Sequence, residues 1–289
     1  MEALRRICDI IMKPLRRNVN FFMFMYLLGC VCAWATLPDT RNARLYDNLY
    51  LELFIDLYLL CILLTVLPRK VMLWVRALLY AVFYAAAVVD VYCFVKFEST
   101  LTPTMLLLVG ETDSREAGEF IKSCVSPDIV FSPVGWVLLV ILSHVLCVLR
   151  LRFPHFIPRR QREFLKSLWL TAAHWMCKWA MAEAAVVVVL LVWAAVSSFH
   201  NKQATWKLMT GRTIGDVEHT LTEKDHAVLY TPVYRLAFSI YANTLTAKQV
   251  QRLVATADKV HVDSCSFRSP NIVLIIGESY NRHHSQMYG

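Results

Sequence analysis

Residues 271–279, NIVLIIGES, combine an apolar run, a glycine and a carboxylate in an order that suits a ligand site. The run is short and rich in β-branched residues, which predicts a strand buried on both faces of a parallel α/β sheet. In such sheets, ligands bind beyond the carboxyl ends of the strands. Glu278 stands at that position, and Gly277 before it lets the backbone approach a ligand closely. A carboxylate there is a ligand for Zn²⁺ or Mn²⁺, although a single carboxylate equally suits a helix cap or a solvated turn.

Other carboxylates stand inside apolar segments, where a charge is costly. Asp56 and Asp90 interrupt two long apolar stretches, and Glu52 precedes Asp56 by one helical turn. A charge at the centre of a bilayer costs at least about 2.5–3.5 kcal/mol, so such acids usually face a bundle interior or water. These acids either line an entry site for a lipid headgroup or are hydrated at the membrane surface. Glu111 and Glu116, in a connection between apolar stretches, either contact an ammonium group or cap a helix.

The elements that must position these residues are mostly helices that span a membrane. Hydrophobic residues make up 57% of the 289 residues, and the mean hydropathy is +0.46, which excludes an ordinary soluble domain. A helix needs about 20 mostly apolar residues to cross the hydrocarbon core. The sequence predicts five such helices, at residues 21–37, 51–67, 71–95, 129–149 and 179–199.

The distribution of Lys and Arg predicts the orientation of these spans. The N-terminal tail and the connections after the second and fourth spans are rich in Lys and Arg, whereas the other two connections are poorer. This alternation places the N-terminus in the cytoplasm and the residues after Phe199 outside. The net charge of +8 then reflects orientation and contact with anionic lipid rather than nucleic-acid binding. Cys124 and Cys265 would face the outside, and their positions do not decide whether they pair.

Further helices are expected outside the spans. Residues 100–126 should form short helices on the outer face, because their apolar residues recur at helical spacing. Residues 200–268 should form a juxtamembrane linker: an interfacial helix with Tyr234, Phe238 and Tyr241 as anchors, and then a separate amphipathic helix from near Thr246. A buried strand needs neighbouring strands and covering helices, so residues 270–289 are expected to begin a second domain whose remainder is absent from this chain.

Two stretches resemble the phosphoethanolamine transferases of lipid A and the lipopolysaccharide core, which belong to the sulfatase/alkaline phosphatase superfamily. In that family, the first strand of the periplasmic domain ends in G-E-S/T, and Arg and L-Y-G-Y-like residues follow. The matching residues are Gly277, Glu278, Ser279, Arg282, Tyr288 and Gly289, with Met287 where Leu is usual. The segment TMLLLVGETDSREAGEF resembles the family's M-x-x-N-V-x-E-T-N/D-x-x-E-A segment, with Leu108 at the usual Asn. Its matching residues are Met105, Glu111, Thr112, Asp113, Glu116 and Ala117.

The resemblance implies an all-α polytopic membrane domain at residues 1–199, followed by the linker and by the first strand of a sulfatase-like α/β domain. Such enzymes of the bacterial inner membrane transfer phosphoethanolamine from phosphatidylethanolamine to lipopolysaccharide through a zinc-activated phospho-threonine. Glu278 would be a metal ligand, and the matched segment supports Glu116 and Glu111 as substrate contacts. Asp90 is a third candidate because of its place in a span. The nucleophilic threonine and the other metal ligands are expected downstream of Gly289, so this chain alone should be inactive.

Two alternatives stay open. A glycerol-phosphate transferase of the lipoteichoic acid synthase type shares the five-span layout, although the G-E-S/T ending argues against it. The other is a non-catalytic polytopic membrane protein, such as a transporter or an assembly subunit. A transporter is less favoured, because the spans contain few Gly or Pro breaks and the chain has no halves related by a repeat.

Overall fold

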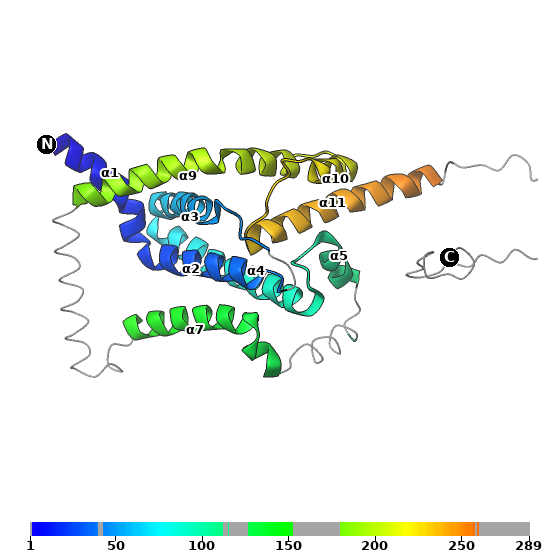
Figure 1. Cartoon of the computed structure of the whole chain (residues 1–289), viewed down its shortest axis with the longest axis horizontal. Coiled ribbons are helices and arrows are strands. Elements are labelled where there is room, and N and C mark those ends of the chain that lie inside the picture. The colour runs from blue at the N-terminus through cyan, green and yellow to red at the C-terminus, as the bar shows by residue number, and fades with distance from the viewer. Residues whose placement is uncertain are drawn as a thin grey trace, which may run out of the picture. The chain divides into compact units, whose positions relative to one another are not determined.

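The computed structural model describes residues 2–39, 43–111, 115, 127–152, 180–257 and 259, and these are mostly helical (Figure 1). No strand occurs within these ranges. The chain divides into two compact units, Met1–Gln249 and Val250–Gly289. The strand predicted after residue 270, with Glu278 at its end, lies outside the described residues, so it stays a prediction.

A bundle of apolar helices forms the first unit. Its long helices are α1 (Glu2–Arg17), α2 (Val19–Ala35), α3 (Leu49–Val66), α4 (Arg69–Phe97), α7 (Pro133–Arg152) and α9 (Ala180–Met209). Helix α2 packs against α3, α4 and α7, while α9 lies alongside α1 and α3 (Figure 1). The largest core cluster joins α2, α3, α4 and α7 and includes Phe21, Leu57, Leu64, Val91 and Val137.

Close packing of α2 against α3 depends on a glycine. A Cβ atom added at Gly29 would lie 2.7 Å from Cδ2 of Leu53, which is closer than side-chain carbons normally approach. Leu53 is itself buried in the core. The absent side chain therefore sets how closely these two helices can pack.

Several helices are long and apolar enough to cross a membrane. Among the described residues they are α3, α4 and α9, and the bent pair α1–α2 counts as a fourth if it forms one broken span. Large apolar side chains such as Trp74, Trp193 and Val196 are exposed on their surfaces. Exposed large apolar side chains recur along each of these helices, which suits contact with lipid. The structure therefore indicates a helical multi-pass membrane protein. This agrees with the general fold class that the sequence predicted.

The prediction of five spans is not confirmed, because three helices, or four with the bent pair, qualify among the described residues. The fourth, predicted at residues 129–149, is displaced along the chain: a 3₁₀ turn at Pro127–Phe131 comes first, and the helix runs from Pro133 to Arg152. Proline at the first helical position favours a start there, and the apolar helix Pro133–Leu149 falls below the length of the other candidates. The fifth begins at Ala180 and continues past Phe199 to Met209.

The N-terminal tail is a helix that packs on the bundle. Helix α1 meets α2 at a bend of 66°, and the buried Asn18 lies at the bend. The Asn18 side-chain amide donates hydrogen bonds to the Pro14 carbonyl (3.1 Å), the Cys61 carbonyl (3.2 Å) and the Thr65 hydroxyl (3.0 Å). These bonds fix the bend against α3, and Met12 packs there with residues of α3 and α9.

The residues after α9 form short and long helices that differ from the sequence prediction. Helix α10 (Ile214–Thr222) is capped by Thr213 and Asp216, and α11 runs without a break over Pro232–Ala257. One continuous helix therefore stands where the sequence predicted two. The hydroxyl of Thr246, the predicted start of the second helix, donates to the Ala242 carbonyl inside α11 (3.1 Å). Phe238, a predicted membrane anchor, is instead buried in a small core with residues of α9 and α10.

The connection between α4 and α7 contains α5 (Pro103–Glu111). This helix falls within the region predicted to form short helices, residues 100–126. Residues 112–114 and 116–126 lie outside the described residues.

Candidate functional site

Two groups of buried polar side chains hold the start of α11 against the bundle. We call the first the acid–tyrosine cluster; it consists of Glu52 and Asp56 on α3, Lys202 on α9, Tyr230 in the connection before α11, and Tyr234 on α11. The second is a single ion pair between Asp90 on α4 and Arg235 on α11. Both groups use carboxylates that the sequence had placed inside apolar stretches.

Glu52 joins α3 to α9. Its side chain is buried, and its two carboxylate oxygens accept hydrogen bonds from the Asn201 amide at 3.2 Å and 3.0 Å. The Lys202 ammonium lies 3.2 Å from the same carboxylate. Asn201 also accepts the Val228 N–H (2.7 Å) and donates to the Val228 carbonyl (3.1 Å). The connection that leads to α11 is therefore held by the same side chains that satisfy Glu52.

Asp56 is the acceptor for three donors from three segments. It accepts hydrogen bonds from the Lys202 ammonium, from the Tyr230 hydroxyl and, at 2.8 Å, from the Tyr234 hydroxyl. The Lys202 nitrogen also lies 5.6 Å from the centre of the Tyr234 ring, which suits a cation–π contact. Two carboxylates and one ammonium leave this cluster with a net formal charge of −1, and protein donors already bond to both carboxylates.

The tyrosines of this site stay protonated near neutral pH. Burial, and then the nearby Asp56 carboxylate, raise the pKa of Tyr234 to about 12. The same causes raise the pKa of Tyr230. Burial and a hydrogen bond with Glu52 raise the pKa of Tyr46 to about 12. These hydroxyls therefore serve as hydrogen-bond donors to carboxylates rather than as bases.

Asp90 is fully buried and bonded to protein groups. Its carboxylate accepts two hydrogen bonds from Arg235, from Nε at 2.8 Å and from Nη2 at 2.6 Å, and one from the Leu101 N–H at 3.1 Å. The remaining Arg235 nitrogen, Nη1, donates to the Leu229 carbonyl at 2.8 Å. Such bidentate pairs are strong and geometrically specific. Asp90 is therefore not hydrated at a surface, and direct contact with a lipid headgroup would require Arg235 to leave.

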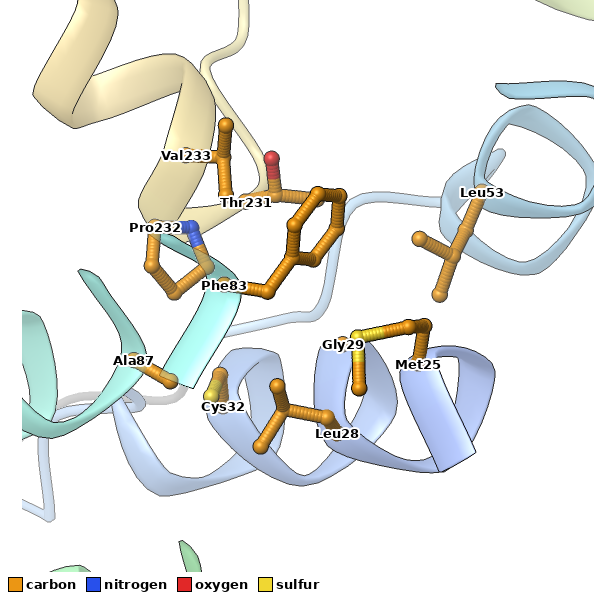
Figure 2. A pocket seen from close by; sticks show the side chains of 10 residues that line it. All are labelled: Met25, Leu28, Gly29, Cys32, Leu53, Phe83, Ala87, Thr231, Pro232 and Val233. Carbon is orange, nitrogen blue, oxygen red and sulfur yellow. The ribbon is translucent and has the colours of Figure 1, made fainter. Parts of the chain in front are cut away.

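The turn at the start of α11 rests on α2 and α4. Figure 2 shows the side chains that line a small cavity here: Thr231, Pro232 and Val233 lie on the same side as Phe83, and α2 contributes the opposite side. The cavity holds about 10 Å³, which is at the limit for one water molecule. Because its lining is almost wholly apolar, we interpret it as a packing gap beneath the turn and not as a ligand site.

A third polar contact lies within the bundle. The Tyr84 hydroxyl on α4 lies 2.6 Å from Nδ1 of His144 on α7. The imidazole ring is enclosed by Phe24 and Tyr80, whose ring centres each lie 4.5 Å from it. A satisfied histidine between aromatic rings holds α7 against α2 and α4, and this arrangement favours a structural role.

The structure does not test whether the predicted site residues come together. Asp90 is paired as described, and Glu111 is the last residue of α5, with no described side chain. Glu116 and Glu278 lie outside the described residues. Within the described ranges, no group of three or more His, Cys, Asp or Glu side chains could hold a metal ion. The zinc site stays a prediction that depends on Glu278.

Sequence reasoning did not identify Arg235 and Lys202 as members of a site. Arg235 is the one charged residue in the stretch YTPVYRLAFSIYANTL, and Lys202 follows soon after the last apolar stretch. The sequence did contain a hint: acids within the spans needed cationic partners, and each of these two segments contains a cation that could serve.

Comparisons with known proteins identified no relative of this chain. No family model, no curated protein and no solved structure matches the chain.

Proposed function

We propose that this chain is the membrane domain and the beginning of the catalytic domain of a phosphoethanolamine transferase. In this proposal the enzyme works in the bacterial inner membrane. It takes phosphoethanolamine from phosphatidylethanolamine and transfers it to lipid A or the core of lipopolysaccharide. Glu278 is one ligand of the catalytic zinc, and Mn²⁺ is an alternative metal.

The observation that supports this proposal most is the anchoring of α11 on the bundle. Arg235 binds Asp90 on α4, while Tyr234, its neighbour in sequence, binds Asp56 on α3. The chain continues from this anchored helix into the segment that carries the G-E-S motif. An enzyme that acts on a membrane lipid gains rate when its reacting groups are held near that lipid. A fixed juxtamembrane helix suits that purpose.

In this proposal, the residues of the membrane domain hold the lipid, and the groups that react lie later in the chain. A zinc ion would lower the pKa of a hydroxyl nucleophile and offset charge on the phosphoryl oxygens. Glu278 supplies one ligand, and Ser279 corresponds to the residue beside that ligand and not to the nucleophile. The threonine and the remaining ligands are proposed to follow Gly289. The 289-residue chain by itself should then bind zinc weakly and transfer nothing.

The decisive experiment measures transfer in cells. The gene product that contains these residues is produced in a Gram-negative strain that lacks its own transferase, and lipid A and core are examined by mass spectrometry. We expect added phosphoethanolamine with the natural sequence, no addition with Glu278→Gln, and full addition with the matched control Glu218→Gln. Glu218 is exposed on α10. Absence of addition with the natural sequence, or undiminished addition with Glu278→Gln, would contradict the proposal.

A second measurement tests the donor. The purified protein is incubated with phosphatidylethanolamine or phosphatidylglycerol, each labelled in the headgroup, and release of diacylglycerol is followed. Turnover of phosphatidylglycerol alone would replace the proposal with glycerol-phosphate transfer. Turnover by the isolated 289-residue chain would show that the nucleophile had been placed wrongly.

A further inference from the structure

A large open groove lies where α2 ends and α7 begins. Its volume is about 1130 Å³, which exceeds the range of about 300–1,000 Å³ that is typical of small-molecule sites. The end of α2, the residues after it, the end of α4 and the start of α7 form its walls. It is distinct from the acid–tyrosine cluster, whose five members are absent from its lining.

The lining of this groove is typical of a membrane surface. Trp34 and Trp136 are 68% and 62% exposed, and Tyr50 is 52% exposed. Trp and Tyr side chains are enriched where a membrane meets water. Val31 and Val95, which are less exposed, also line the groove and give it an apolar wall. A ligand that fits must therefore have a long apolar part and a headgroup that reaches water.

Two acids give the groove its charge. Asp39, in the residues after α2, and Glu98, directly after α4, both line it and are both exposed. Among the residues that the structure describes, neither carboxylate has an ion-pair or hydrogen-bond partner. This contrasts with Asp56 and Asp90 in the same bundle, which are paired with a lysine and an arginine. The groove therefore keeps two negative charges available to a ligand.

We propose that this groove binds one phospholipid whose headgroup carries an ammonium group. The acyl chains lie against the apolar wall and the two tryptophans, and the ammonium lies near Asp39 and Glu98. An anionic headgroup without an amine would meet two like charges and bind less well. That the bound lipid serves as the donor rests on the proposed function, whereas the binding itself requires no chemistry.

The test measures lipid binding by the whole 289-residue chain. Delipidated protein is titrated with phosphatidylethanolamine, phosphatidylcholine or phosphatidylglycerol of identical acyl chains, and bound lipid is counted by native mass spectrometry. The test variant is Asp39→Asn with Glu98→Gln. The matched control is Glu218→Gln with Asp225→Asn, which makes the same charge change at exposed positions outside the groove. Circular dichroism confirms that both variants are folded.

The natural chain should prefer phosphatidylethanolamine over phosphatidylglycerol by about fivefold to tenfold, because one exposed ion pair changes an equilibrium by up to about fivefold. The groove variant should reduce this preference to within about twofold, and the control should keep it. Equal binding of both lipids by the natural chain would overturn the proposal. So would an unchanged preference in the groove variant. Phosphatidylcholine tests whether the groove needs a primary amine. If it binds more weakly than phosphatidylethanolamine, the groove recognises a primary ammonium group. If the two lipids bind equally, the groove recognises any ammonium headgroup.

The apolar part of the site has its own test. Val95→Trp fills the groove and should weaken all three lipids by at least about fivefold, whereas Val196→Trp, on an exposed face of α9, should not. A photoreactive group in place of Trp34 should crosslink to lipid. Crosslinks to residues 112–126 or to a second copy of the chain would show another occupant and overturn the proposal. Lipid preference without transferase activity would refute the proposed function alone, and transfer without lipid preference would refute the groove alone.

Discussion

The Asp90–Arg235 pair gives the sharpest test of how the bundle holds α11. Arg235→Met keeps much of the apolar stem of the side chain and removes the guanidinium. It leaves a carboxylate of 0% exposure with one remaining hydrogen bond, from the Leu101 N–H. Removal of one partner of a buried ion pair typically costs about 3–5 kcal/mol, because the other charge stays buried and uncompensated. We expect that loss in the free energy of unfolding.

The reverse change should cost less. Asp90→Asn keeps an acceptor for the Leu101 N–H, and Arg235 is partly exposed, with the Leu229 carbonyl still available. Hydrogen bonds to charged groups are worth about 1.5–3 kcal/mol, which sets the expected cost. The double variant restores neutrality, so its cost should be less than the sum of the single costs by about 1–3 kcal/mol.

The assay is equilibrium unfolding in mixed detergent micelles, followed by far-ultraviolet circular dichroism. Reaction of thiols gives a second signal, because Cys32 and Cys61 are fully buried in the folded bundle. The control is Arg252→Met, the same chemical change at an exposed position on α11. Surface changes of this kind usually alter stability by less than about 0.5 kcal/mol.

Two results would refute the reasoning. If Arg235→Met cost no more than Arg252→Met, Asp90 would not depend on the guanidinium. If the double-variant cost equalled the sum of the single costs, the two side chains would be energetically independent despite their contact.

Three further predictions concern other contacts. Asp56→Asn removes the charge that accepts three donors and should increase amide hydrogen exchange in residues 228–235 at least about tenfold, as measured by mass spectrometry. Gly29→Leu forces a side chain against Leu53 and should destabilise the bundle by about 1–3 kcal/mol, whereas Gly110→Leu, which meets open space, should not. A hydrogen bond from Lys207 lowers the pKa of Glu223 below its usual 4.5, so α10 should lose exchange protection as the pH falls below about 4.5. Glu223→Gln should reduce that dependence and leave the part due to Asp216, whose pKa is lowered by its hydrogen bond with Thr213 in the cap of α10.

The helices of the bundle could be predicted where hydropathy alone decides them. Helices α3 and α4 coincide closely with two predicted spans, because a backbone in hydrocarbon must satisfy its own hydrogen bonds. Helix ends were less predictable. Helix α9 continues to Met209 although apolar residues become fewer near Phe199. A drop in hydropathy shows where a helix leaves the membrane, but the helix can continue in water because its backbone hydrogen bonds do not depend on hydropathy.

The site was predictable as a set of acids but not as a set of pairs. Glu52 and Asp56 are four residues apart, so a helix places them on one face, and the sequence alone shows that both needed partners. The partner of Asp90 lies 145 residues later in the chain, and no local pattern reports such a distance. Phe238 shows the same limit, since an aromatic residue on an amphipathic helix suits a membrane surface and a protein core equally well.

The two polar contacts that hold α11, Asp56–Tyr234 and Asp90–Arg235, involve adjacent residues of this helix, so together they can fix its rotation. Successive side chains on a helix diverge by about 100°, so Tyr234 and Arg235 reach acids on different helices, α3 and α4. Rotation of α11 about its axis would therefore break both contacts. A buried ion pair adds little net stability over an apolar replacement. Strong coupling between Asp90 and Arg235, with a double-variant cost well below the sum of the single costs, is therefore the result expected of contacts that set the orientation of α11.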